Sequence, residues 1–449
     1  MNCLFCVFLI KVVGTKKSQP RDKQMKKIII IHVLLATLLL ATLTSCVPVK
    51  PRPQPQIPIK KASVSITEEA NLNQPNWKDV PALKDAYKDY FEYFGFAVPE
   101  NQLKDKKLME GLSWQASCFT CENECKPDFI FNWAKPTSLV DFVAEDGKTY
   151  QVPPSLAGFK RLGEILTIAR DNGMKMRGHV LVWHGQTPDW FFKQNYSSDG
   201  AMVDKATMTA RQEWYIKSVL EFVKTWEEEN NNNQRIIITW DVVNEACTDG
   251  SWEDNPLRTA SPWFAIYGDD TFIVNAFRYA NKYAPKEVQL AYNDYSSYSP
   301  AKTKAICRVV QDIQAARDAR IDVVGMQSHV SMSYPTINDY EKAVQQFVAL
   351  GVNVQVTEME IAFGGRLVSQ EILKERYIEY FKMFLKNRKT AGKHGISGIT
   401  LWGTKDEVSW IRNNSDEMNK VQRPLLFEKD YECKPAFFGV LETAQNYKD

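Results

Sequence analysis

The sequence lacks the motifs of a metalloprotein or of a cofactor-dependent enzyme. No Gly-rich phosphate loop lies between an expected strand and helix. Cys118, Cys121 and Cys125 form a cluster, but their spacing fits no zinc pattern. His179 and His184 are five residues apart on an expected strand, and therefore on opposite faces. We expect neither a metal nor a cofactor.

Long hydrophobic runs are also missing after the first fifty residues. The one apolar run, residues 28–43, follows Lys26 and Lys27 and ends in Leu-Thr-Ser-Cys at residues 43–46. At sixteen residues it is shorter than the roughly 20 residues that span a bilayer. It is typical of an export signal, and its end resembles a bacterial lipobox, which implies lipidation of Cys46. An ordinary cleaved signal and an uncleaved anchor are the alternatives, and translation starts at Met1 or at Met25.

An excess of positive charge is absent once this segment is set aside. Residues 47–449 hold 49 Lys and Arg against 53 Asp and Glu, a net charge of −4. Such a protein has no electrostatic basis for binding nucleic acid. Five prolines between residues 48 and 58 indicate that residues 47–75 are an extended spacer. We therefore divide the chain into a signal peptide with lipobox (1–46), a Pro-rich spacer (47–75) and one catalytic domain (76–449).

Short β-rich apolar runs alternate with longer helical stretches throughout this domain. Strands are expected over residues 94–98, 115–119, 174–183, 236–243, 288–292, 323–327, 354–357 and 399–402. Helices are expected over residues 155–172, 206–228, 270–283, 301–319, 337–350 and 370–387. Eight strands alternating with helices predict an α/β fold, a parallel (β/α)8 TIM barrel.

Polar and aromatic residues recur at the carboxyl ends of these strands, where such barrels have their active sites. Glu245 and Glu358 stand out, because each terminates an almost continuous apolar run. Burying a lone carboxylate is costly, so each requires a partner, solvent or a catalytic reason for its place. They belong to the fourth and seventh strands, which face each other across a barrel. One carboxylic acid that protonates a leaving oxygen, opposite a carboxylate that attacks the sugar, suits glycosidic cleavage.

Several motifs carry a resemblance to a known family. They are Trp240-Asp-Val-Val-Asn-Glu-Ala246 and residues 177–188, 293–295, 325–329, 356–361 and 398–403. In this order they resemble glycoside hydrolase family ten, the endo-β-1,4-xylanases, over residues 80–445. The resemblance implies a retaining mechanism with Glu245 as acid/base and Glu358 as nucleophile.

The resemblance also implies the residues around these two. Asn244 would hydrogen-bond the sugar hydroxyl next to the reacting carbon, and His329 would hold the nucleophile. The usual partner of that histidine is an Asp two residues after the nucleophile, and here the position is Glu360. Further substrate contacts are implied for Glu122, Asn123, Lys126, His179, Trp183, Gln186, Tyr295, Gln327, Trp402 and Trp410.

The implied substrate is xylan or xylo-oligosaccharides. Two alternatives stay open: hydrolysis of another β-linked glycan, such as mixed-linkage glucan, and a non-catalytic glycan-binding lipoprotein. A barrel that had lost its activity and only binds glycans should lack one of the two catalytic carboxylates, and this chain keeps both. The expected location is a bacterial membrane, the outer membrane or cell surface, with Cys46 as the lipid anchor.

Overall fold

The computed structural model describes residues 74–249, 256–365, 367–412 and 420–448. The expected signal peptide, Cys46 and the spacer up to residue 73 lie outside these ranges, so the division at residues 46 and 75 stays a prediction. Among the helices that the structure describes, none has both the length and the hydropathy for a bilayer crossing.

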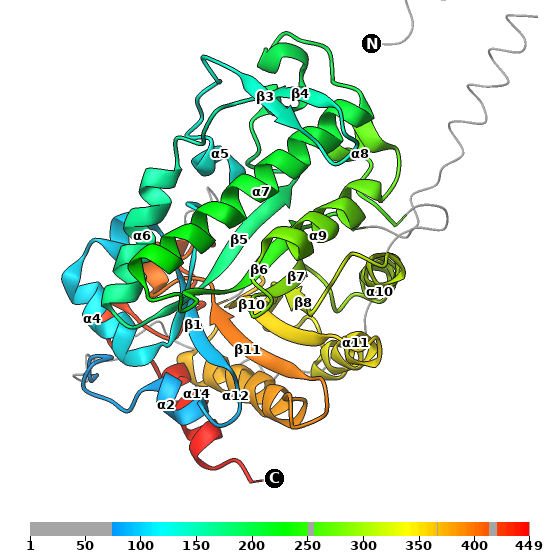
Figure 1. Ribbon diagram of the computed structural model, residues 1–449. Coiled ribbons are helices and arrows are strands. Elements are labelled where there is room, and N and C mark those ends of the chain that lie inside the picture. The colour runs from blue at the N-terminus through cyan, green and yellow to red at the C-terminus, as the bar shows by residue number, and fades with distance from the viewer. Residues whose placement is uncertain (1–73, 250–255, 366, 413–419, 449) are drawn as a thin grey trace, which may run out of the picture. The chain divides into compact units, whose positions relative to one another are not determined.

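Within the described residues, eight parallel strands close into a barrel (Figure 1). In order around the barrel they are β1 (Tyr93–Val98), β2 (Cys118–Cys121), β5 (Lys175–Trp183), β6 (Ile237–Asn244), β7 (Gln289–Asp294), β8 (Val323–Met326), β10 (Asn353–Ala362) and β11 (Ile396–Leu401). Strand β11 pairs with both β10 and β1, which closes the sheet. The predicted (β/α)8 TIM barrel is confirmed.

Helices cover the outside of the barrel (Figure 1). The longer ones are α4 (Lys106–Gln115), α6 (Phe159–Asp171), α7 (Lys205–Asn230), α9 (Thr271–Tyr283), α10 (Pro300–Ala315), α11 (Ile337–Ala349), α12 (Gln370–Lys386) and α14 (Pro435–Gln445). The short ones are α2 (Leu83–Tyr87), α3 (Glu100–Leu103), α5 (Pro127–Ile130) and α8 (Pro262–Tyr267), with 3₁₀ turns at Asp189–Phe192, Gln194–Tyr196, Asp406–Val408 and Lys429–Tyr431. The side chains of Asp204, Thr336 and Ser369 cap α7, α11 and α12 by accepting first-turn N–H groups.

The second strand begins later than the sequence predicts. The prediction was residues 115–119, whereas α4 continues to Gln115 and β2 starts at Cys118. The buried Gln115 side chain accepts a hydrogen bond from the N–H of Leu83 and donates one to the carbonyl of Trp77. These partners lie more than thirty residues away, so a local pattern does not reveal that Gln115 belongs to the helix.

A hairpin interrupts the barrel pattern after α5. It consists of β3 (Val140–Val143) and β4 (Thr149–Val152), which pair antiparallel and which the sequence analysis does not anticipate. The hairpin lies against α7 (Figure 1). Its turn is attached there by a hydrogen bond of 2.8 Å from the Glu145 N–H to the carboxylate of Glu213. The hairpin thus extends the loop region that follows β2.

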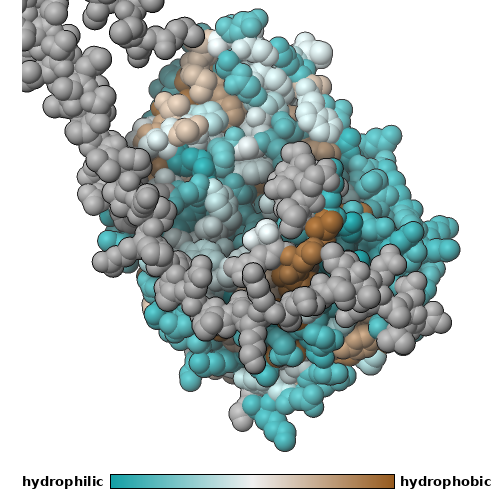
Figure 2. All heavy atoms as spheres, turned by 180° about the vertical axis from the view of Figure 1, so that it is seen from behind, coloured by the Kyte–Doolittle hydropathy of each residue, from teal (hydrophilic) through white to brown (hydrophobic). Residues whose placement is uncertain are grey.

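The barrel interior is not purely apolar. Arg177 and Asp241 form a buried ion pair at 2.6 Å, and Arg177 also donates to Gln355 at 3.0 Å. Because both charges have partners, their burial is tolerated. On the outside, the face in Figure 2 is mainly hydrophilic, with hydrophobic side chains confined to small patches, as is usual for a globular domain.

Candidate active site

The sequence predicts that Glu358 terminates its strand. In the structure Glu358 lies inside β10. Strand β10 continues to Ala362 because its last residues pair with an added short strand, β9 (His329–Ser331). The register of β10 against β11 shifts between Val356 and Met359. Glu358 occupies this irregular stretch, and irregular strands are common next to active sites.

The environment of Glu358 favours its ionised form. The residue is only 5% exposed. Asn293 Nδ2 donates to its Oε1 at 2.9 Å, and His329 Nε2 lies 3.1 Å from its Oε2. Burial opposes ionisation, but these hydrogen bonds outweigh it, and the pKa of Glu358 lies below its usual range.

His329 lies between two carboxylates. Its Nδ1 is 2.7 Å from Glu360 Oε1, while its Nε2 faces Glu358. Burial disfavours the imidazolium, yet the two hydrogen bonds prevail and raise the pKa of His329 to about 10. The pKa of Glu360 is raised by burial, against the opposing effect of His329. Glu360 therefore reaches the histidine from the position where an Asp is usual in the resembled family.

The second carboxylate, Glu245, immediately follows β6 in an unusual backbone conformation. Its φ is +55°, which few residues with a side chain adopt. Arg258 Nε donates to the carbonyl of Glu245 at 3.1 Å. The hydroxyl of Tyr292 accepts hydrogen bonds from the N–H groups of Ala246 and Cys247. Side chains from later in the sequence therefore fix the turn that carries Glu245.

The Glu245 side chain accepts hydrogen bonds from three donors. Trp183 Nε1 is 3.0 Å from its Oε2. Gln327 Nε2 and Asn244 Nδ2 are 2.9 and 3.1 Å from its Oε1. Trp183, Asn244 and Gln327 come from the ends of three different strands, β5, β6 and β8. The structure brings these three predicted site residues together around Glu245.

A hydrogen-bond network joins the two carboxylates. Asn293 Nδ2 donates both to Glu358 and, at 3.0 Å, to Asn244 Oδ1. Asn244 in turn donates to Glu245. Asn293 lies in one of the motifs of the sequence, but its role follows only from the structure; its place at the end of β7 was the available signal. Two amides thus separate Glu245 from Glu358.

A polar cluster from the loop after β2 lies on one side of Glu245. Lys126 Nζ donates to Asn123 at 3.1 Å and to Gln186 at 2.8 Å, and it lies 5.0 Å from the centre of the Trp183 ring. Burial lowers the pKa of Lys126 and raises that of Glu122 to about 7. These residues, all predicted substrate contacts, form one group that reaches Glu245 through Trp183.

A histidine and two tryptophans border the carboxylates. His179 Nδ1 lies 2.9 Å from Asp241, which ties it to the buried Arg177–Asp241 pair. The Trp402 ring lies 5.7 Å from the His179 ring, edge to face. Trp410 is half exposed, packs 5.5 Å from the His329 ring and donates its indole N–H to Glu360. The contact of His179 with the Asp241–Arg177 pair was not predicted, because a pair between two strands leaves no local pattern in the sequence.

Tyr295 occupies a different side of Glu245. Its hydroxyl donates to Asp249 Oδ2 at 2.5 Å and accepts from Arg258 at 2.8 Å. The ammonium of Lys302 lies 4.2 Å from the centre of its ring. Because Arg258 also donates to the backbone carbonyl of Glu245, Tyr295 is linked through one side chain to the turn that carries Glu245.

The cysteine cluster consists of free, buried thiols at Cys118, Cys121 and Cys125. In the part of the chain that the structure describes, no group of three His, Cys, Asp or Glu side chains is arranged to hold a metal ion.

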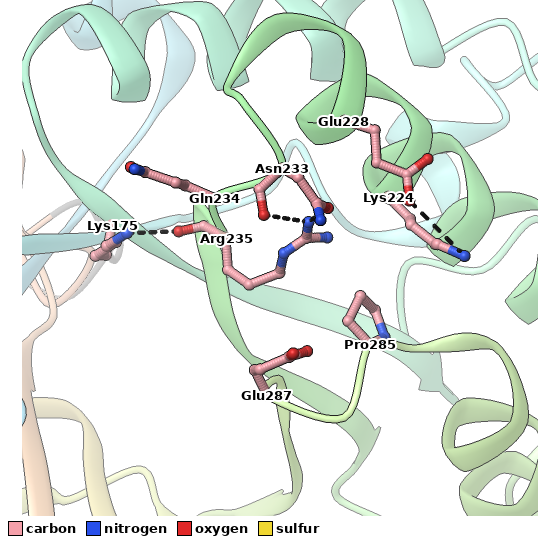
Figure 3. Close-up of a pocket in the computed structure, with 8 residues that line it drawn as sticks. All are labelled: Lys175, Lys224, Glu228, Asn233, Gln234, Arg235, Pro285 and Glu287. Atoms are coloured by element: carbon pink, nitrogen blue, oxygen red, sulfur yellow. Dashed lines mark hydrogen bonds and ion pairs between the residues drawn. The ribbon is translucent and has the colours of Figure 1, made fainter.

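A surface pocket of about 500 Å³ lies away from these residues (Figure 3). It is formed by the start of β5, the end of α7 and the segments before β6 and β7, hence at the amino ends of the strands. Lys175 there donates to the carbonyl of Arg235 at 2.6 Å. In barrels of this kind the amino ends contribute to stability, while active sites lie at the carboxyl ends.

Comparisons with known proteins identify the family of this chain. Residues 82–443 match the family described as "Glycosyl hydrolase family 10". Endo-1,4-beta-xylanase B of Butyrivibrio fibrisolvens is 36% identical over 363 residues, 81% of this chain and 53% of its own length. Bifunctional endo-1,4-beta-xylanase XylA of Ruminococcus flavefaciens is 34% identical over 366 residues, 81% of this chain and 34% of its own. This chain thus spans about half and about a third of these two relatives.

A solved structure is also similar. It holds the CBM22-1 and GH10 modules of Clostridium thermocellum endo-1,4-beta-D-xylanase 10B, complexed with xylohexaose. The TM-score is 0.67 at 30% identity, over 82% of this chain and 69% of that one. The family match covers most of the chain, and the barrel and paired carboxylates accord with it: this protein belongs to glycosyl hydrolase family 10.

Proposed function

We propose that this protein is a retaining endo-1,4-β-xylanase. One observation carries the proposal: Glu245 and Glu358 are joined through two amides at the carboxyl-end rim of the barrel. A retaining glycosidase needs two carboxyl groups roughly 5–5.5 Å apart, one acting as nucleophile and the other as acid and then base.

The surroundings support an assignment of the two roles. Glu358, with its lowered pKa and its contacts to His329 and Asn293, is the nucleophile. It attacks the anomeric carbon while Glu245 protonates the departing oxygen, which gives a covalent glycosyl–enzyme ester. Glu245 then removes a proton from water, which attacks the same carbon and releases Glu358.

The remaining polar residues bind the sugars. Asn244 hydrogen-bonds the sugar hydroxyl next to the reacting carbon. Trp402 and Trp410 cover the apolar faces of the sugar ring. Asn123, Lys126 and their neighbours bind the units on the non-reducing side, and Tyr295 lies on the leaving-group side.

The substrate is tested most simply with three polymers. The purified protein is incubated with xylan, cellulose and mixed-linkage glucan, and the reducing ends formed are counted. We expect release from xylan, with a rapid fall in viscosity because an endo-acting enzyme cuts internal bonds. Release mainly from mixed-linkage glucan would favour the alternative specificity, and no release would favour a binding protein.

The protein is proposed to act outside the cell. The apolar leader and the Leu-Thr-Ser-Cys sequence at residues 43–46 support export and lipidation of Cys46. The Pro-rich spacer would then hold the domain away from the outer membrane or cell surface.

A further inference from the structure

Trp133 is an exposed tryptophan on the active-site face of the barrel. It lies in the loop after α5, and this loop follows the carboxyl end of β2. Its side chain is 53% exposed. Both Asn132 and Trp133 have positive φ, 54° and 53°. Holding such residues in this region costs free energy. Because half of the Trp133 side chain is in water, burial does not explain the arrangement.

The indole of Trp133 is nevertheless held in place. The Phe129 ring packs against it with centroids 4.4 Å apart, edge to face. The guanidinium of Arg161 lies 5.7 Å from its ring centre. The backbone N–H of Trp133 donates to the carbonyl of Asp128 at 2.9 Å, which fixes the chain at this residue. The exposed ring is therefore pre-organised, which reduces the entropy lost when a ligand binds to it.

The support of Trp133 is continuous with the polar cluster beside Glu245. Arg161 pairs with Glu100 at 3.1 Å, and the N–H of Glu100 donates to Glu124 at 2.9 Å. The same Glu124 carboxylate accepts the N–H of Asn123 at 3.2 Å. Asn123 is one of the residues proposed to bind sugars on the non-reducing side. Trp133 is thus connected to that group through Arg161, Glu100 and Glu124.

The charges around Trp133 indicate a neutral ligand. The guanidinium of Arg161 is occupied by Glu100, the carbonyl of Phe129 and the side chain of Asn132. The positive charge next to the Trp133 ring is therefore already paired, so it does not favour an anionic ligand. A flat aromatic face suits the apolar face of a pyranose. We propose that Trp133 is a stacking platform for a backbone xylose unit, beyond those bound by Asn123 and Lys126 on the non-reducing side.

This inference rests on the proposed function, and its test uses substrates of two lengths. Trp133→Ala, Trp133→Phe and the parent are compared on xylohexaose and on an aryl β-xylobioside, whose two sugars are too short to reach the platform. Stacking stabilises bound substrate and transition state equally, so it affects KM more than kcat. For Trp133→Ala we expect KM for xylohexaose to rise about threefold to tenfold, with kcat and the xylobioside rate unchanged. Trp133→Phe should recover much of the affinity.

Trp114→Ala is the matched control, because Trp114 is 47% exposed but lies on α4, near the amino end of β2. It should leave both substrates unaffected. Unchanged kinetics of Trp133→Ala on xylohexaose would overturn the platform. An equal loss on both substrates would also overturn it, since it would assign Trp133 a structural role. If the parent cleaves neither substrate, the proposed function itself fails.

Discussion

At the scale of single residues, the two glutamates of the site, Glu358 and Glu245, lie in different surroundings. Glu358 contacts a histidine and an amide and is nearly buried, and its pKa is lowered. Glu245 accepts an indole N–H and two amide N–H groups. A nucleophile must be ionised before it attacks, and the contacts of Glu358 favour that state.

The first prediction concerns Glu360, which contacts both His329 and Trp410. Glu360→Gln keeps the length of the side chain but removes the charge that stabilises the imidazolium. We expect kcat on xylan to fall about tenfold to hundredfold, as is usual when a hydrogen-bonded supporting residue is lost. Glu375→Gln on α12, an exposed position, is the control and should not change kcat. A full rate in Glu360→Gln would mean that another group orients His329.

A second prediction concerns stability as a function of pH. The pKa of His329 is raised from 6.5 to about 10, so the folded protein keeps a proton that the unfolded chain loses. This contribution is complete below pH 6.5 and declines as the pH rises towards 10. The difference in Tm between the parent and His329→Gln should therefore shrink from pH 6 to pH 10. A difference that grows with pH would contradict the charged histidine.

Much of this residue-scale picture was accessible from the sequence. The strand-end motifs indicated Glu245, Asn244, Gln327 and His329. The structure places the first three in mutual contact. His329 contacts Glu358, which reaches Asn244 through Asn293. The supports Asn293, Asp241 and Arg258 were not assigned. Each acts on a partner from another strand or loop, so its role depends on folding rather than on local sequence.

At the scale of elements, periodicity predicted a range that overlaps each of the eight barrel strands, because each contains a short apolar run between helices. It began the second strand at residue 115, which belongs to α4, instead of at Cys118, and it missed the β3–β4 hairpin. Gln115 was assigned to the strand because its hydrogen bonds to Leu83 and Trp77, residues distant in the sequence, cannot be read from the local pattern. The hairpin strands have only four residues each and are mostly exposed. The alternation of polar and apolar residues in Thr149-Tyr-Gln-Val152 was the available signal, but it is short.

The third prediction tests how tightly the barrel strands are packed. A Cβ at Gly178 in β5 would lie 2.3 Å from the ring of Trp240, which is buried in β6. Gly178→Ala should therefore destabilise the protein by about 1–3 kcal/mol, measured by denaturant unfolding. In Gly163→Ala on α6 the added carbon meets nothing closer than 3.5 Å, and stability should rise by about 0.5–1 kcal/mol. Equal stability of the two variants would refute this packing.

At the scale of the whole molecule, we propose that the catalytic domain and the segment before it carry separate functions. The barrel holds the proposed chemistry, and the proposed anchor lies in residues 1–46. The fourth prediction is that Cys46→Ser, expressed in a bacterium that exports it, releases the protein from the membrane fraction with unchanged specific activity on xylan. Continued fractionation with membranes would show that lipid at Cys46 is not the anchor.

The proposal as a whole depends on the separate roles of two carboxylates within one barrel. Removing the nucleophile in Glu358→Ala should reduce hydrolysis of every substrate to near background. Removing the acid/base in Glu245→Ala should be severe on xylan, whose leaving group is poor. It should be much milder on an aryl xylobioside with an acidic phenol.

The most direct measurement is azide rescue of Glu245→Ala on that aryl xylobioside, with the product identified by NMR. The mutant lacks the base that activates water, so its covalent intermediate should accumulate. Azide needs no base and fits the space left by the side chain. We predict restored turnover and a β-xylobiosyl azide, the product of two inversions at one carbon. An α-configured azide from Glu245→Ala, or a β-azide formed by Glu358→Ala while Glu245→Ala is not rescued, would contradict the assignment.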